Sequence, residues 1–193
     1  MQKQPDATSW NGWRSILAIG FMSALLSGCA GPALEDYSNL EPELEPTRFF
    51  EGELVARGVV KDWSGEVIRT FDADITASWD EDGVGTLDEV FRFNDGERQT
   101  RVWTLTPDGE GYRATAGDVV EAGQMRWSGN AIHMNYVLRV EYGDDDSTLD
   151  VRMDDWMHLV TEDTLINQTT MSKWGFNVGE LVLVIRKLEP MNE

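Results

Sequence analysis

The chain has 193 residues, one cysteine and 35 acidic against 16 basic side chains, which gives a formal charge of −19. A nucleic acid must be met by clustered Lys and Arg, and the sequence has no such cluster, so nucleic-acid binding is excluded. Eight Trp, seven Phe and four Tyr can form a core, which excludes a fully disordered chain. The length fits one domain, and a single cysteine cannot form an internal disulfide.

Residues 1–28 are typical of a secretory signal peptide. Lys3 and Arg14 give a basic start, and an apolar run follows at 16–26. This run is too short to span a bilayer. It leads into Leu-Ser-Gly-Cys ending at Cys29, which resembles the bacterial lipobox, in which the cysteine thiol takes a diacylglycerol before cleavage. The alternative is an ordinary signal peptide that ends at a chance cysteine.

Lipidation of Cys29 would make the membrane a partner of this protein through a covalent anchor. Each buried CH₂ of a lipid chain contributes about 0.8 kcal/mol, so the anchor holds without any membrane-binding face. Ala30, rather than Asp, follows the cysteine, and by resemblance to sorted lipoproteins this indicates the outer membrane of a Gram-negative cell. We therefore expect the protein on the periplasmic face of that membrane.

Residues 29–47 form an acidic segment that contains several prolines. Proline and like-charge repulsion both extend a chain, which predicts a semi-stiff tether between the lipid and the folded domain. The alternative is an N-terminal strap, in which the leucines of this segment dock on the domain. Those leucines are Leu34, Leu40 and Leu44.

Residues 48–193 are predicted to form one β domain, because alternating apolar positions recur and no helical period is sustained. The clearest strand is 132–142, and a second strand follows the polar loop 143–146. If Tyr142 pairs with Ser147, apolar residues of both strands share the inner face and polar residues share the outer face, which supports this register. The further pairs are then Arg139–Asp150, Asn135–Asp154, Leu138–Val151 and Tyr136–Met153.

About nine or ten strands are expected, joined mostly by short loops. Their predicted starts lie near residues 49, 66, 84, 98, 110, 119, 131, 148, 163 and 180. Consecutive antiparallel strands with tight turns form a meander, which hides its edges by closing on itself. We therefore predict an all-β fold, an antiparallel meander closed into a barrel of about 8–10 strands with room for one small ligand. A two-sheet sandwich is the alternative.

A tight turn at 94–96 places two opposite charges among apolar inner positions. A type I turn closed by a left-handed glycine puts Glu89 opposite Arg101 and Leu87 opposite Trp103. Such a charged pair could hold the carboxylate or hydroxyl of a ligand in an apolar cavity. The alternative is a structural salt bridge that closes the barrel floor.

A second polar group is predicted where the strand after 147 meets the next one. With a turn at 161–163, Asp155 faces Thr169, Asn167 lies diagonal to it, and Tyr136 lies on the neighbouring strand. A few converging polar groups in an apolar lining are the usual form of a small-molecule site. A self-satisfied hydrogen-bond network is the alternative.

The stretch after this polar group contributes two further candidate ligand contacts. Met171 continues the inner row, and Lys173 precedes Trp174 in a predicted loop or short helix that could cap one barrel mouth. Lys173 is expected either to contact the ligand or to be solvated.

Catalytic and metal-binding patterns are sparse in this sequence. His133 and His158 are the only histidines, and the predicted register puts both on the outer surface. No further His or Cys completes a typical zinc set, and no G-x-S-x-G motif occurs. We expect no catalytic residues, no metal and no cofactor.

Several short stretches resemble a family of Gram-negative lipoproteins known as domain of unknown function 3833. The resemblance spans nearly all of the chain after the cysteine, and it implies a lipocalin-like or calycin-like barrel and favours a lipid ligand. The matching stretches are Phe50-Glu51-Gly52, Asp118-Val119-Val120 with Gly123, Gly129-Asn130-Ala131, Asp154 to Met157, and Asn167 to Gly175 with Met171 and Lys173.

The leading functional prediction is a non-enzymatic lipoprotein whose barrel binds or shields an apolar molecule, such as a fatty acyl chain. One alternative is an envelope scaffold with a packed interior and an outer binding surface around Trp156, His133 and Trp79; no protein partner can be named from the sequence. A second alternative is an enzyme that acts on a lipid through Asp155 or Glu89.

Overall fold

The computed structural model describes residues 31–142 and 147–189. It separates into a short N-terminal unit and a compact unit that begins at Leu34, and all described helices and strands belong to the compact unit. The predicted signal peptide, the lipidated Cys29 and the loop 143–146 lie outside the described residues. Within the described part of the chain, no helix has the length and apolar character needed to cross a membrane.

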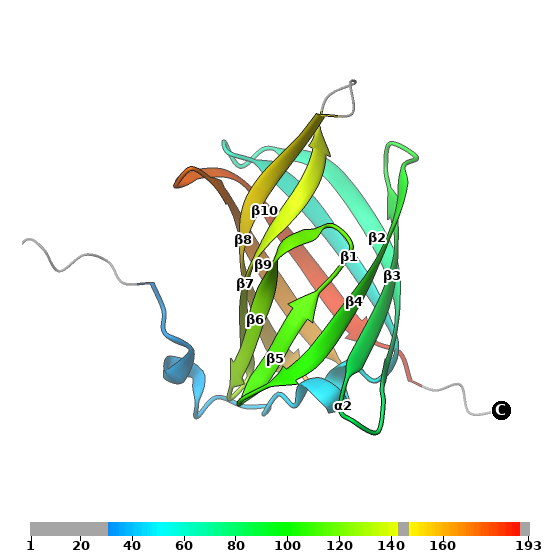
Figure 1. Cartoon of the computed structure of the whole chain (residues 1–193), viewed down its shortest axis with the longest axis vertical. Helices are drawn as coiled ribbons and strands as arrows, with labels where there is room; N and C mark the ends of the chain where they lie inside the picture. Colours follow the sequence, from blue (N-terminus) through cyan, green and yellow to red (C-terminus); the bar gives the residue numbers. More distant parts are fainter. Residues whose placement is uncertain (1–30, 143–146, 190–193) are drawn as a thin grey trace, which may run out of the picture. The chain divides into compact units, whose positions relative to one another are not determined.

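Ten antiparallel strands form a closed barrel, in which each strand pairs with the next along the chain and β10 pairs with β1 (Figure 1). Among the described residues, two short helices precede them, η2 (Leu34–Tyr37) and α2 (Pro46–Phe50). The strands are β1 (Gly52–Asp62), β2 (Val67–Trp79), β3 (Gly85–Phe93), β4 (Arg98–Asp108), β5 (Gly111–Thr115), β6 (Val119–Ser128), β7 (Ala131–Tyr142), β8 (Ser147–Thr161), β9 (Thr164–Lys173) and β10 (Phe176–Lys187). The predicted all-β meander closed into a barrel is confirmed, and the two-sheet sandwich is not formed.

The predicted registers are confirmed in the hairpins that carry the candidate site. Glu89 pairs with Arg101 across β3 and β4, and Asp155 pairs with Thr169 across β8 and β9. All the pairs predicted for β7 and β8 also occur. Because a slip of one residue would turn every side chain to the other face, the alternation of the sequence correctly assigned which side chains point inward.

The first strand begins later than predicted, because Phe49 and Phe50 belong to helix α2. Both rings are buried, with their centroids 5.1 Å apart. Consecutive side chains of a strand point to opposite faces, so a helical turn is needed to bury both. Helix α2 lies at one end of the barrel (Figure 1), where Phe50 forms part of the cavity wall. The last strand begins earlier than predicted, at Phe176.

The segment before α2 packs on the barrel. Leu44 is 1% exposed, and its backbone N–H donates to the carbonyl of Gly129 at 2.8 Å. The ring of Tyr37 lies 5.6 Å from that of Trp156, whereas Leu40 is 47% exposed. These contacts match the strap alternative for residues 34–47, with Leu44 as its anchoring side chain.

The barrel wall has a gap next to the short strand β5. Strand β4 pairs with β5 only from Thr104 onward, so among the described strands residues 98–103 of β4 pair only with β3. Arg101 lies on this unpaired stretch and binds Asp118 in the loop between β5 and β6. A side-chain ion pair therefore joins the wall where backbone pairing stops.

Candidate functional site

The barrel interior contains a cavity of about 120 Å³. Its lining is mainly apolar and includes Phe50, Ala56, Ile75, Leu87, Trp103 and Met134. The polar side chains in the lining are Glu89, Arg101, Tyr136, Asp155 and Asn167. The structure thus brings together, around one cavity, six of the site residues predicted from the sequence.

The guanidinium of Arg101 is held mainly by Asp118, a residue that the sequence analysis did not assign to the site. Arg101 Nε and Nη2 donate to the Asp118 carboxylate at 3.0 and 2.7 Å. Arg101 Nη1 lies 3.8 Å from Glu89 Oε2, and this oxygen is buried with no hydrogen-bond partner among the described residues. The predicted Glu89–Arg101 pair is therefore a long contact, and the bidentate pair is Arg101–Asp118.

Burial raises the pKa of Glu89 to about 7. Its side chain is 13% exposed, and a desolvated carboxylate is less stable than the neutral acid. The Arg101 charge and the Trp103 side chain oppose this shift, while the charges of Asp118 and Asp155 add to it. Glu89 therefore gains and loses its proton near neutral pH.

A second polar cluster links strands β8 and β9. Thr169 Oγ1 donates to Asp155 Oδ1 at 2.9 Å, and Asn167 Nδ2 donates to the same oxygen. Asn167 Nδ2 also donates to the backbone oxygen of Trp156 at 3.2 Å. Among the described residues, no hydrogen bond reaches Asp155 Oδ2. The self-satisfied network considered above is therefore complete for one carboxylate oxygen only.

Burial in the same low-dielectric interior also raises the pKa values of Asp155 and Tyr136. Burial raises the pKa of Asp155 to about 6, although the hydrogen bonds from Asn167 and Thr169 oppose the shift. Burial and the charge of Asp155 raise the pKa of Tyr136 well above its ordinary value. The Tyr136 phenol, whose ring meets that of Trp103 edge-on at 5.3 Å, therefore remains a hydrogen-bond donor at neutral pH.

Three predicted site residues, Thr169, Met171 and Lys173, are not among the residues that line the cavity. Thr169 is fully buried, and its hydroxyl donates a hydrogen bond to Asp155, which lines the cavity. Met171 is partly buried and packs against the core. Lys173 is the last residue of β9 rather than part of a loop or short helix, and its Nζ donates to the Asp150 backbone oxygen at 2.5 Å. A ligand contact by Lys173 stays a prediction.

The two histidines lie on the outer face of the barrel. His133 stacks on Trp156 with centroids 4.1 Å apart, and its Nε2 lies 2.7 Å from Asp154 Oδ1. The Tyr37 ring covers this group and lies 4.9 Å from that of His158. In the part of the chain that the structure describes, no three or more His, Cys, Asp or Glu side chains are grouped to hold a metal.

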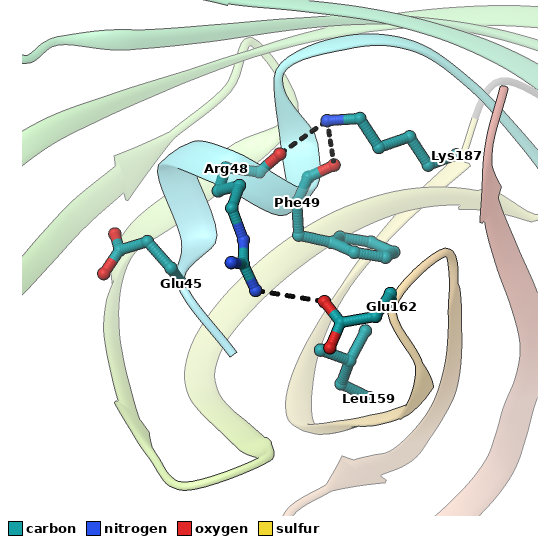
Figure 2. A pocket seen from close by; sticks show the side chains of 6 residues that line it. All are labelled: Glu45, Arg48, Phe49, Leu159, Glu162 and Lys187. Atoms are coloured by element: carbon teal, nitrogen blue, oxygen red, sulfur yellow. Dashed lines mark hydrogen bonds and ion pairs between the residues drawn. The ribbon is translucent and has the colours of Figure 1, made fainter. Parts of the chain in front are cut away.

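A second hollow, of about 240 Å³, lies beside α2 (Figure 2). Lys187 Nζ donates to the backbone oxygens of Arg48 and Phe49, and Arg48 pairs with Glu162 at 3.1 Å. The side chains of Arg48 and Glu162 are 67% and 74% exposed, so a molecule in this hollow would remain hydrated. These contacts fasten α2 to the barrel, and the interior cavity is the better candidate site.

The closed ten-strand meander, whose interior holds a mainly apolar cavity with a few inward polar groups, places the chain in the class of closed antiparallel β-barrels. Within that class, the chain belongs to the family of proteins of unknown function DUF3833, whose model matches residues 23–187. This finding confirms the family resemblance derived from the sequence.

The barrel is similar to the S-type phycobiliprotein lyase CPES from Guillardia theta, with a TM-score of 0.54 and 12% sequence identity. The match covers 82% of this chain and 100% of the other. No curated protein sequence matches the chain. The prediction of a non-enzymatic protein is corrected by this neighbour, because a protein with a similar fold is a lyase by name and the fold gives no basis for excluding an enzyme.

Proposed function

We propose that this protein binds one small, mainly apolar molecule inside the barrel, with the polar end of that molecule at Glu89, Tyr136 and Asp155. The observation that supports this proposal is the mainly apolar cavity inside the barrel, which these side chains line. A packed barrel core would have no reason to retain carboxylates, because burying each charge costs free energy unless it is paired.

The volume of the cavity limits the size of the ligand group that can enter without rearrangement of the lining side chains. An engineered apolar cavity of about 150 Å³ binds benzene, so a cavity of about 120 Å³ takes a group near the size of one ring. Met125, Met134 and Met157 also line it, and methionine side chains repack readily around ligands. A longer, lipid-like molecule such as an acyl chain would enter by moving these side chains.

We place this binding protein at the periplasmic face of the outer membrane, held there by a lipid on Cys29. The lipobox-like stretch that ends at Cys29 and the following Ala30 support this location. A covalent anchor is compatible with the chain's large negative charge, because acyl chains bind the bilayer through the hydrophobic effect.

The outer surface predicted for the envelope-scaffold alternative is partly occupied by the chain itself. The ring of Tyr37 from the strap packs against Trp156, with their centroids 5.6 Å apart. Trp79 does not lie with it on an outer face: its Nε1 donates to the Tyr112 hydroxyl at 3.4 Å, and its ring packs against the core. The aromatic surface predicted for a partner is therefore partly engaged in contacts within the chain, and Trp79 does not belong to it.

Two neighbouring residues of β10 provide the test of cavity binding. Leu183 lines the cavity, whereas Val184 is 39% exposed. Replacement of Leu183 by Trp should fill the cavity and abolish binding of toluene, measured by titration calorimetry or ligand-observed NMR, while Val184→Trp should bind as the wild type does. Native mass spectrometry of the membrane-extracted protein should reveal a co-purifying molecule. Unchanged toluene binding by a folded Leu183→Trp variant would refute the cavity as the site.

A second candidate function is acid–base chemistry on the bound molecule. Glu89 and Asp155 line one cavity with pKa values of about 7 and about 6, and carboxyls that titrate near neutrality are suited to proton transfer. The test is to incubate the co-purifying molecule with wild type and with Glu89→Gln and to follow its mass. Conversion by wild type alone would support catalysis, and no conversion by either would contradict it.

A further inference from the structure

We infer that the cavity selects a molecule whose polar end donates hydrogen bonds, an ammonium above a neutral hydroxyl, and rejects a carboxylate on a body of the same shape. This inference rests on the proposed binding of a small molecule in the barrel and specifies the chemistry of its head group. The carboxylate oxygens that line the cavity and receive no hydrogen bond from the described residues determine this selectivity.

Among the described residues, the one lining atom that is buried without a hydrogen-bond partner is an acceptor. Glu89 Oε2 is buried without a hydrogen-bond partner among the described residues. Asp155 is 4% exposed and lines the cavity, and the hydrogen bonds it receives from described residues reach Oδ1 only. An unpaired buried acceptor such as Glu89 Oε2 costs about 1–3 kcal/mol. A ligand N–H or O–H placed between these oxygens would remove that cost.

The one cation in the described lining is already engaged. Arg101 uses Nε and Nη2 on Asp118, at 3.0 and 2.7 Å, and its Nη1 lies 3.8 Å from Glu89. An incoming carboxylate would have to displace Asp118 and then lie close to Glu89. The charges of Arg101 and Asp118 cancel each other, so an ionised Glu89 or Asp155 makes the cavity negative. A ligand carboxylate close to these negative charges would be repelled, because like charges at short distance disfavour the ionised form of each group.

Three further groups with donor capacity do not change this balance. The indole N–H of Trp103, which also lines the cavity, is directed at Glu89 and stabilises its carboxylate. The amide of Asn167 is used by Asp155 and by the Trp156 backbone. The Tyr136 hydroxyl can donate one hydrogen bond to a ligand, but it can also accept one. A ligand carboxylate would gain the Tyr136 donor alone and would face the acceptor oxygens of Glu89 and Asp155. A ligand ammonium has three N–H donors, one for each of these three side chains.

Four probes of nearly equal size separate the head group from the ring, namely toluene, benzyl alcohol, benzylamine and benzoate. Dissociation constants are measured by titration calorimetry at pH 8 on the folded protein, with toluene reporting the cavity itself. We expect benzylamine to bind tightest, benzyl alcohol next, and benzoate at least tenfold more weakly than benzylamine. Equal or tighter binding of benzoate overturns the inference.

Substitution of each cavity carboxylate tests whether its oxygens determine the preference for an ammonium over a carboxylate. In Glu89→Gln the preference for benzylamine over benzoate should fall at least fivefold, and Asp155→Asn offers the same test at the second carboxylate. The exposed Glu97→Gln is the matched control and should keep the wild-type ratio. Toluene binding without amine preference refutes the head-group inference alone, whereas binding of none of the four probes refutes the proposed function and the inference with it.

Discussion

Glu89 and Arg101 stand directly opposite each other on β3 and β4, yet the closest approach of their charged atoms is 3.8 Å. The guanidinium turns instead toward Asp118, at 2.7 Å. Glu89 is thus left with a distant counter-charge in a dry environment, which is why its pKa lies near neutrality.

Replacement of Glu89 by Gln should stabilise the protein at pH 8 and leave its stability nearly unchanged at pH 4. The pKa is raised on folding from 4.5 to about 7, so folding favours the protonated acid. The resulting stability is present below pH 4.5 and is lost as the pH rises through 7, by roughly 3 kcal/mol at most. Urea unfolding at both pH values measures the difference. A Gln variant less stable than wild type at pH 8 would contradict the assigned burial.

Replacement of Asp118 by Asn should lower the pKa of Glu89. Without the Asp118 charge, the Arg101 guanidinium is free to approach Glu89, and a nearer cation favours the carboxylate. Titration of ¹³C-labelled Glu side chains by NMR measures the shift. Stability should fall by about 1–3 kcal/mol, as for loss of a hydrogen bond to a charged group. An unchanged Glu89 pKa would show that Arg101 is held in place by something other than Asp118.

Leu44→Ala should destabilise the protein by about 2–4 kcal/mol, the usual cost of emptying a buried leucine site. Leu40 belongs to the same strap and is 47% exposed, whereas Leu44 is 1% exposed. Leu40→Ala is therefore the matched control and should change the free energy of unfolding by less than about 0.5 kcal/mol. Equal small effects in both variants would argue for the free tether instead of the strap.

Trp174→Asn should stabilise the β9–β10 hairpin by about 0.5–1 kcal/mol. Trp174 is 85% exposed and has φ of 50°, a left-handed conformation that Asn tolerates better than a large side chain. Phe176 is similarly exposed, at 74%, but it has no positive φ, so Phe176→Asn should give no such gain. Thermal unfolding of both variants measures the difference. A loss of stability in Trp174→Asn would show that the contact of the indole with Lys173 Nζ, 5.3 Å from the ring centroid, outweighs the backbone conformation.

Cys29→Ser should release the protein from membranes. Serine cannot form the thioether that carries the diacylglycerol, so the proposed anchor would be absent. Fractionation of cells that express each form, followed by detection of the protein in the sedimented membranes, provides the measurement. A Ser variant that still sediments with membranes would refute the lipobox interpretation.

Alternation along the strands and the short polar turns were sufficient to predict the barrel, its registers and most of its inward polar residues. Glu89, Arg101 and Asp155 stood out because each interrupts an apolar row. Asp118 could not be found in this way, because it lies in a loop, where no periodicity indicates a direction. Its place in a stretch that resembles the family was the one available signal.

The positions of helix α2 and the strap also could not be predicted from sequence periodicity. Two adjacent phenylalanines, Phe49 and Phe50, read as the start of a strand, although burying both requires a helical turn. In the strap, one leucine out of several is buried, and composition alone cannot identify which. Such short segments are positioned by the surface that they meet rather than by their own sequence pattern.

The gap beside β5 has a consequence for how copies of this protein meet in solution. A complete barrel has no strand edge, whereas residues 98–103 of β4 lack a described strand on one side, and bare edges invite pairing between molecules. Arg98, Gln99 and Thr100 along this stretch are exposed. Polar and charged residues of this kind are how natural sheets discourage such pairing, so the wall can stay incomplete without making the protein prone to aggregate.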